Sequence, residues 1–180
     1  LDAPESIHAL AFSPKGQAMA AGLYDGRTAV WDLGQEPPPA PRLLVGLILF
    51  QIALGGLVAG SKAGLTYNTW PLMDGQLIPN GLGVMQPWYL NLFENAMTVQ
   101  FNHRMVAYVV VLAVAWHAWS TLRGSGDARI RGTAIVLAGA TLLQVVLGIW
   151  TLLAQVPLSL GLAHQAGAAA LFAVAVWHLY

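Results

Sequence analysis

The 180-residue chain has no cysteine and very little charge. Without cysteine, disulfide bonds, thiolate catalysis and cysteine-ligated zinc or iron–sulfur sites are excluded. Only 9% of the residues are Asp, Glu, Lys or Arg, whereas roughly a quarter is usual for a soluble domain. The eight basic and eight acidic residues cancel to zero net charge, so no basic surface is available to bind phosphate backbones. We therefore expect no nucleic-acid partner.

Apolar residues dominate instead, at 57% of the chain, with a mean hydropathy of +0.60. A helix needs about 17 to 25 apolar residues to cross a bilayer, and because lipid offers no hydrogen bonds, isolated spans must be α-helical. Four runs meet this length. The sequence therefore predicts an all-α membrane protein, a four-transmembrane-helix bundle over residues 43–180 in contact with the lipid bilayer. The spans are roughly Leu43–Gly60, Ala96–Leu122, Gly132–Ala154 and Leu158–Tyr180.

The first 35 residues have a different character. They contain short β-like runs, "IHALAFSP", "AMAAGLYDG" and "RTAVWDL", separated by turn signals at Pro14-Lys15-Gly16 and Asp25-Gly26. The segment "EPPPAPR", residues 36–42, is typical of an extended, semi-rigid linker. Because the chain starts at Leu1 without a signal peptide, and ends inside an apolar run, we expect it to be a piece of a longer protein.

Basic residues predict the orientation of the helical domain. Arg123, Arg129 and Arg131 lie between the second and third spans, and Arg42 precedes the first, while the aromatic loop between the first two spans has one basic residue, Lys62. The positive-inside rule then places both ends of the helical domain in the cytoplasm and the aromatic loop outside.

Two histidines lie within the predicted spans at similar depth. His103 and His164 each follow the outer end of a span by about seven residues, or roughly 10 Å of helix. Bundle cores hold cofactors between facing helices, and without thiolate or carboxylate partners the fitting metal centre is a haem iron with two imidazole ligands. The alternative is two unrelated histidines bonded to nearby backbone.

A second pair repeats the same spacing. His117 and His178 each follow a histidine of the first pair by 14 residues, nearly four helical turns. This spacing is compatible with a second haem, as in a diheme cytochrome b. The alternative is that both residues, preceded by Trp116 and Trp177, anchor helix ends in the membrane interface.

The first and third spans also resemble each other, in "QIALGGLVAG" (51–60) and "QVVLGIWTLL" (144–153). Gly55, Gly56 and Gly148 are small enough for a porphyrin or a neighbouring helix to approach, and helix packing alone would explain them.

Two cations near the outer surface complete the candidate site. Arg104 and Lys62 lie beside the proposed haem edge, where they could bind its propionates; the alternative is that they are snorkelling interfacial cations. Asp74 and Glu94 are too loosely placed in the outer loop to assign an acid or base, so the catalytic residues are unknown.

Long motifs give the chain a family resemblance. "GGLVAGSKAGLTYNTWPLMDGQLIP", "NLFENAMTVQFNHRMVAY" and "QVVLGIWTLLAQVPLSLGLAHQAGAAAL" resemble the C-terminal half of the haem A synthase family, from about Arg42 onward. The resemblance implies half of an eight-helix fold, a role in oxidising the haem O methyl group to the haem A formyl group for cytochrome oxidase, and haem b bound by His103 and His164.

The same resemblance implies a missing part. The family's N-terminal bundle holds the substrate, with an acidic residue three positions before its His-Arg, whereas Gln100 stands three positions before His103 here. We therefore expect a cofactor half that is not competent alone and that needs an N-terminal half or a homo-oligomer. The compact loops favour a bacterial inner membrane over a mitochondrial one.

The N-terminal segment resembles a different family. "HALAFSPKGQAMAAGLYDGRTAVWDL", about residues 6–33, is similar to a single WD-repeat blade, in which His8 is a blade residue. One blade cannot bury its own faces, so we expect it to pack poorly. Two other functions stay open: a diheme b-type electron-transfer cytochrome, and a non-enzymatic membrane-anchored interaction module. The three functions require one, two and no haems per chain.

Overall fold

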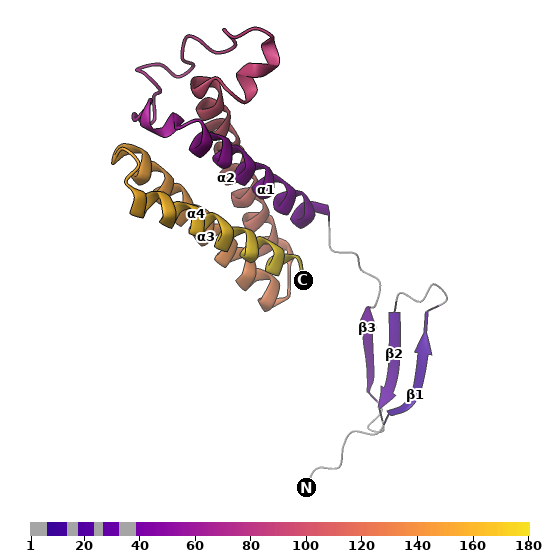
Figure 1. The fold of residues 1–180 in the computed structure, drawn as a ribbon. Coiled ribbons are helices and arrows are strands. Elements are labelled where there is room, and N and C mark those ends of the chain that lie inside the picture. Colours follow the sequence, from indigo (N-terminus) through magenta and orange to yellow (C-terminus); the bar gives the residue numbers. More distant parts are fainter. Residues whose placement is uncertain (1–6, 14–17, 24–26, 33–38) are drawn as a thin grey trace. The chain divides into compact units, whose positions relative to one another are not determined.

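The structure is a computed structural model that describes residues 7–13, 18–23, 27–32 and 39–180. The chain divides into two compact units, Leu1–Pro38 and Pro39–Tyr180, and each is described by itself. The first contains a small β-sheet and the second a helical bundle (Figure 1).

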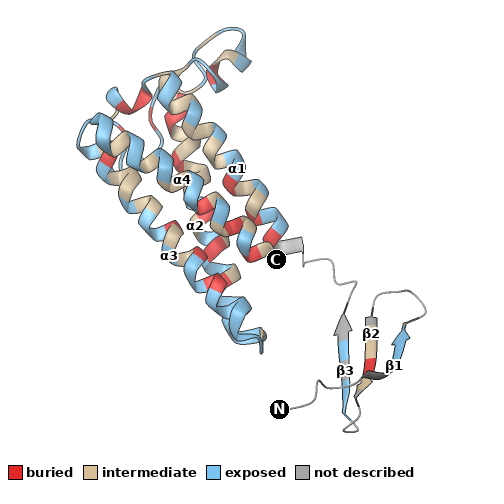
Figure 2. Cartoon of the chain, turned by 60° about the horizontal axis from the view of Figure 1, so that its bottom comes forward, coloured by how far each residue is buried: buried red, intermediate tan, exposed pale blue. Residues whose placement is uncertain are grey.

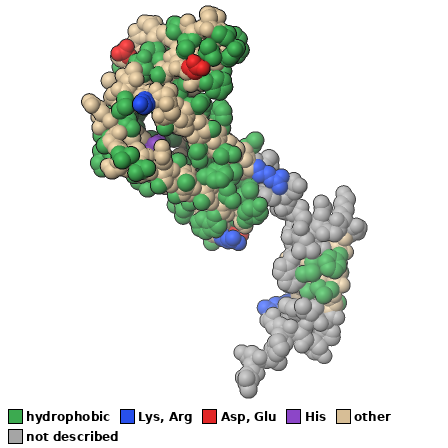
Figure 3. Space-filling view, in the orientation of Figure 1, with side chains coloured by type: hydrophobic (Ala, Val, Ile, Leu, Met, Phe, Trp, Pro, Cys, Tyr) green, Lys and Arg blue, Asp and Glu red, His purple; other side chains and the backbone are tan. Residues whose placement is uncertain are grey.

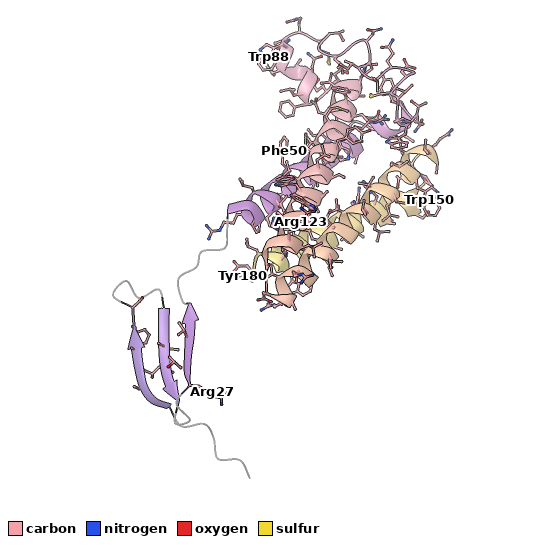
Figure 4. The ribbon with its side chains drawn as sticks, turned by 180° about the vertical axis from the view of Figure 1, so that it is seen from behind. Arg27, Phe50, Trp88, Arg123, Trp150 and Tyr180 are labelled. Carbon is pink, nitrogen blue, oxygen red and sulfur yellow. The ribbon has the colours of Figure 1, made fainter. Side chains whose placement is uncertain are left out.

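The helical unit contains the four predicted spans. Each of its long helices is apolar and long enough to cross a membrane, which confirms the predicted fold class. Many large apolar side chains face outward, as lipid contact requires; Phe50 of α1 and Trp150 of α3 are 54% and 58% exposed (Figure 4). The helices are α1 (Pro39–Gly60), α2 (Ala96–Gly124), α3 (Ala128–Leu153) and α4 (Leu158–Leu179).

The four helices form a ring in which each contacts two neighbours. α1 packs on α2 and α3 on α4 as hairpins, and the ring closes through contacts of α2 with α3 and of α1 with α4. The buried apolar core occupies one end of the bundle, the early parts of α1 and α3 and the later parts of α2 and α4 (Figure 2). The opposite end is therefore less tightly packed. The core residues are Leu44, Ile48, Val110, Val114, Leu137, Leu171 and Ala175.

The start of α1 corrects the prediction of an extended linker over 36–42. The chain is already helical from Pro39, so residues 39–42 belong to the first turn of the helix. The first four N–H groups of a helix have no intrahelical acceptor, and proline, which lacks that donor, is accommodated there. A run of prolines can therefore begin a helix as well as form a spacer.

The N-terminal unit contains an antiparallel three-stranded sheet in the order β1 (Ile7–Phe12), β2 (Ala18–Leu23), β3 (Thr28–Asp32). These strands match the three predicted runs, while the predicted turns at 14–16 and 25–26 lie outside the described residues. Leu10, Phe12 and Val30 are 55%, 64% and 68% exposed. This agrees with the expectation that one small sheet cannot bury its own faces.

The loop between α1 and α2 is folded onto the bundle. It contains two short helices, η1 (Ala63–Leu65) and η2 (Trp88–Leu92). The buried Asn91 ties the loop to itself, since its side chain accepts from Met85 N at 2.9 Å and donates to Met85 O at 2.9 Å and to Trp88 O at 2.8 Å. Asn68 donates to Leu152 O of α3 at 3.2 Å. The loop is thereby fixed over the less packed end of the bundle.

Candidate haem site

The two histidines of the first pair lie on α2 and α4, half-buried, in the less packed half of the bundle. The space-filling view shows a hollow in this part of the helical unit, with a histidine side chain in its wall and a basic side chain near its rim (Figure 3). A histidine side chain of the helical unit therefore adjoins an open volume.

His103 is held by two residues of α1. The amide nitrogen of Gln51 lies 3.0 Å from His103 Nδ1 and donates to the His103 carbonyl oxygen at 3.0 Å. Gly55, one turn further along α1, faces the edge of the ring, since a Cβ added there would lie 3.2 Å from His103 Cε1. The ring thus lies against a glycine and beside an amide.

His164 is held in the same way by α3. The amide nitrogen of Gln144 lies 3.1 Å from His164 Nδ1 and donates to the His164 carbonyl oxygen at 2.7 Å. A Cβ added at Gly148 would lie 2.8 Å from His164 Cε1, closer than real Cβ contacts allow. Both hairpins therefore present the same arrangement of glutamine, glycine and histidine.

Two of the three glycines thus lie where a side chain of the neighbouring helix approaches closely. Gly55 and Gly148 make room for imidazole rings, whereas a Cβ at Gly56 would meet nothing within 4 Å. Gln51 and Gln144 were given no role by the sequence analysis, although they begin the two similar segments. The amide oxygens of both glutamines are buried without a hydrogen-bond partner.

The arrangement fits a haem bound by two imidazoles. The described residues contain no group of three or more His, Cys, Asp or Glu side chains that could enclose a bare metal ion. A haem iron needs only two axial ligands from the protein, since the porphyrin supplies the other four. The two half-buried imidazoles, each beside a glycine of the neighbouring helix, are a donor set of that kind.

The structure places the two candidate cations differently. Arg104 is only 9% exposed, and its guanidinium donates to the loop carbonyls of Tyr67 at 3.1 Å and Leu72 at 3.4 Å. It is therefore a buried anchor of the outer loop and not a snorkelling cation, although its Nε is buried without a partner. Lys62 lies two residues after the end of α1, in the left-handed conformation with φ 54°, at the position that caps the start of η1.

The second histidine pair lies toward the opposite end of the bundle and is directly hydrogen-bonded. His117 Nε2 and His178 Nε2 are 2.7 Å apart, and His178 Nδ1 is 2.7 Å from Thr133 Oγ1. The Thr133 hydroxyl also lies 3.1 Å from Ile130 O of its own helix. The tautomers of the two imidazoles set which atom donates in each contact. Two imidazoles and one hydroxyl thus join α2, α3 and α4.

This distance argues against a second haem. Imidazole nitrogens bind first-row metals at about 2 Å, so two axial ligands of one iron stand about 4 Å apart. The 2.7 Å between His117 Nε2 and His178 Nε2 leaves no room for an iron between them. The pair is an interhelical hydrogen bond in this structure, which explains the two residues without a diheme cytochrome.

Thr133→Val is expected to lower the stability of the bundle by about 1 kcal/mol, because His178 Nδ1 loses its hydrogen-bond partner on α3. Thr141→Val is the matched control: that buried hydroxyl donates only to Leu137 O in its own helix, at 2.8 Å, so its loss should cost less. Thermal unfolding of the purified variants in one detergent measures both. Equal unfolding temperatures for the two variants would contradict the role of Thr133 as an interhelical tie.

Together, the four spanning helices and the paired histidines define an integral membrane bundle with a candidate haem site. The family model described as cytochrome oxidase assembly protein (COX15-CtaA) matches residues 27–176. The chain belongs to this family.

Curated relatives agree with this assignment. The chain is 51% identical to the haem A synthase of Parvibaculum lavamentivorans over 141 residues, which cover 78% of this chain and 40% of that protein. It is 54% identical to the haem A synthase of Brucella anthropi over 138 residues, 75% of this chain and 38% of that protein. It thus spans about two fifths of the length of these relatives. No solved structure matches the chain.

The comparisons change the interpretation of the N-terminal segment. The family match begins at residue 27, inside the segment that resembles a WD-repeat blade, and earlier than the resemblance from about Arg42 indicated. The comparisons give no support to a WD repeat over residues 6–33. The structure shows three antiparallel strands there.

Proposed function

We propose that this chain acts in haem A biosynthesis as the haem b-binding half of a haem A synthase, which oxidises the haem O methyl group to the formyl group of haem A. Membership of the cytochrome oxidase assembly family and the names of its relatives support the pathway. One observation supports the assignment to the haem b-binding half: in each hairpin a glutamine and a glycine of one helix contact the histidine of the other, His103 or His164. We call each such set of contacts a cradle.

In this proposal His103 and His164 are the axial ligands, one from each hairpin of the bundle. A haem iron with two imidazole ligands supplies one-electron transfer. The protein holds both rings against α1 and α3, so their orientation is set before a cofactor arrives. Lys62 would bind one haem propionate, and Arg104 would bind the other through its Nε, which has no hydrogen-bond partner.

The proposal also assigns partners and orientation. Oxidation of haem O then requires a second four-helix half, from another polypeptide segment or a second copy, to bind the substrate. We place the arginine-rich end of the bundle in the cytoplasm of a bacterium. Arg123 lies 4.4 Å over the Trp119 ring at the end of α2, an aromatic and cationic pairing suited to the membrane interface.

The haem stoichiometry of the detergent-purified chain tests the proposal. We expect one haem b per chain, seen in the reduced-minus-oxidised visible spectrum and quantified against protein. Two haems per chain would move the protein to the diheme class and overturn the assignment. Folded, helical protein that takes up no haem would reject haem binding altogether and favour a membrane-anchored interaction module.

A further inference from the structure

We infer that Gln51 and Gln144 are positioning residues that set the proton and the orientation of the two haem-ligating imidazoles. This inference rests on the proposed function. It concerns side chains that neither the composition nor the family match singles out, and it assigns them a measurable effect on the cofactor.

The arrangement of glutamine, glycine and histidine occurs twice in the bundle. On α1 and on α3 a glutamine stands four residues before the glycine that faces the ring, so the two residues share a helix face. Each amide nitrogen lies 3.0 or 3.1 Å from Nδ1 of one histidine and donates to the carbonyl oxygen of that histidine. The Gln51 amide nitrogen also lies 3.4 Å from His103 Nε2. A chance contact would not be expected to repeat with the same atoms in both hairpins.

Each imidazole that binds a metal through Nε2 needs an acceptor for the proton on its Nδ1. A neutral imidazole that gives Nε2 to a metal carries its proton on Nδ1, and that N–H normally donates to an outer-shell acceptor. In both hairpins the side chain beside Nδ1 is a glutamine amide. A glutamine amide contains one donor and one acceptor group, so half a turn of the amide exchanges them.

The amide oxygens of the two glutamines are available as acceptors for these protons. Gln51 Oε1 and Gln144 Oε1 are both buried without a hydrogen-bond partner. Buried polar atoms are rarely left unpaired, and a half-turn would aim each oxygen at an Nδ1–H. The histidine carbonyl would lose the amide donor, but it lies inside a helix, where the backbone N–H four residues later is its regular partner. The site thus contains an acceptor for each ligand's proton.

An acceptor on Nδ1–H makes the imidazole a stronger electron donor and fixes the plane of the ring. A stronger donor stabilises ferric over ferrous iron, so the glutamines should hold the midpoint potential down. Loss of an outer-shell partner typically weakens metal binding by 10- to 100-fold. A glutamine that only joined two helices would alter stability without an ordered change in the potential.

The test uses the full haem-loaded chain and measures midpoint potential and haem dissociation. Gln51→Leu and Gln144→Leu should each raise the potential and speed haem loss about tenfold or more. Gln51→Glu and Gln144→Glu, which supply a stronger acceptor, should lower the potential below that of the unmodified chain. Gln165→Leu is the matched control, because this exposed residue lies beside His164 on α4 and should leave both quantities unchanged.

Potentials and dissociation rates that stay at the unmodified values in both leucine variants would overturn the inference while leaving the proposed function intact. A shift of the same sign in leucine and glutamate variants would also overturn it, since that result indicates structural disturbance. The leucine variants introduce no charge and decide the question by themselves if the glutamate variants do not fold. An unmodified chain that binds no haem would instead reject the proposed function.

Discussion

Haem is expected to be lost when either His103 or His164 is replaced by alanine, with binding weakened by more than about 100-fold. Removal of an outer-shell partner alone costs 10- to 100-fold in metal proteins, and these changes remove an axial ligand itself. The reduced-minus-oxidised spectrum of each purified variant, normalised to protein, measures the effect. Neither histidine belongs to the packed core at the other end of the bundle, so the removal of an imidazole leaves that core in place.

His117→Ala is the control for this pair. It removes an imidazole from the same helix as His103 but breaks the hydrogen bond to His178, 2.7 Å away, and leaves the haem ligands in place. We expect full haem content with a lowered unfolding temperature. Haem retained in the His103 and His164 variants, or lost with His117, would show that the ligands have been assigned to the wrong pair.

Gly148→Ala should reduce haem affinity about tenfold or more while the fold is kept. An added Cβ would lie 2.8 Å from His164 Cε1, so the ring must move away from the position that Gln144 and the glycine define. In other respects alanine favours a helix over glycine by roughly 1 kcal/mol. The expected result is therefore an unchanged or raised unfolding temperature together with weaker haem binding, measured by thermal unfolding and haem titration.

Alanine substitutions at three further glycines should have smaller effects on haem affinity than Gly148→Ala. Gly55→Ala should have a smaller effect, because its Cβ would lie 3.2 Å from His103 Cε1 and a shift of a few tenths of an ångström relieves the contact. Gly139→Ala on α3 and Gly56→Ala on α1 meet nothing within 4 Å and should bind haem normally. Equal haem affinity in the Gly148 and Gly139 variants would refute the steric role of the cradle.

Hydropathy was enough to predict the helices. Their lengths follow from the thickness of the bilayer, so the spans were found to within a few residues, and the caps account for the differences. Asp127, for example, caps α3, which begins at Ala128 and not at the predicted Gly132, by accepting from Arg129 N at 2.7 Å. The start of α1 was misplaced because Pro39 and Pro41 fit an extended spacer and a first helical turn equally well.

The candidate site was only partly predictable. Depth along the helices selects His103 and His164 because a histidine in an apolar span is conspicuous in the sequence. It gives no rotation about the helix axis, so the contacts of Gln51 and Gln144 with the rings could not be derived from it. The repeat of glutamine followed four residues later by glycine was a usable signal. The hydrogen bonds of Arg104 could not be predicted, because its partners are backbone carbonyls of a folded loop, which no residue pattern reveals.

The uneven packing of the bundle bears on the order of its biogenesis. The core of Leu44, Val114 and Leu137, and the hydrogen bond between His178 and Thr133, join the helices at one end through contacts between protein side chains. Under the proposed function, the helices would assemble in the membrane through this end, while the half that contains His103 and His164 stays accessible. Cofactor insertion would then be a late maturation step, and a cell short of haem would accumulate the assembled bundle without it.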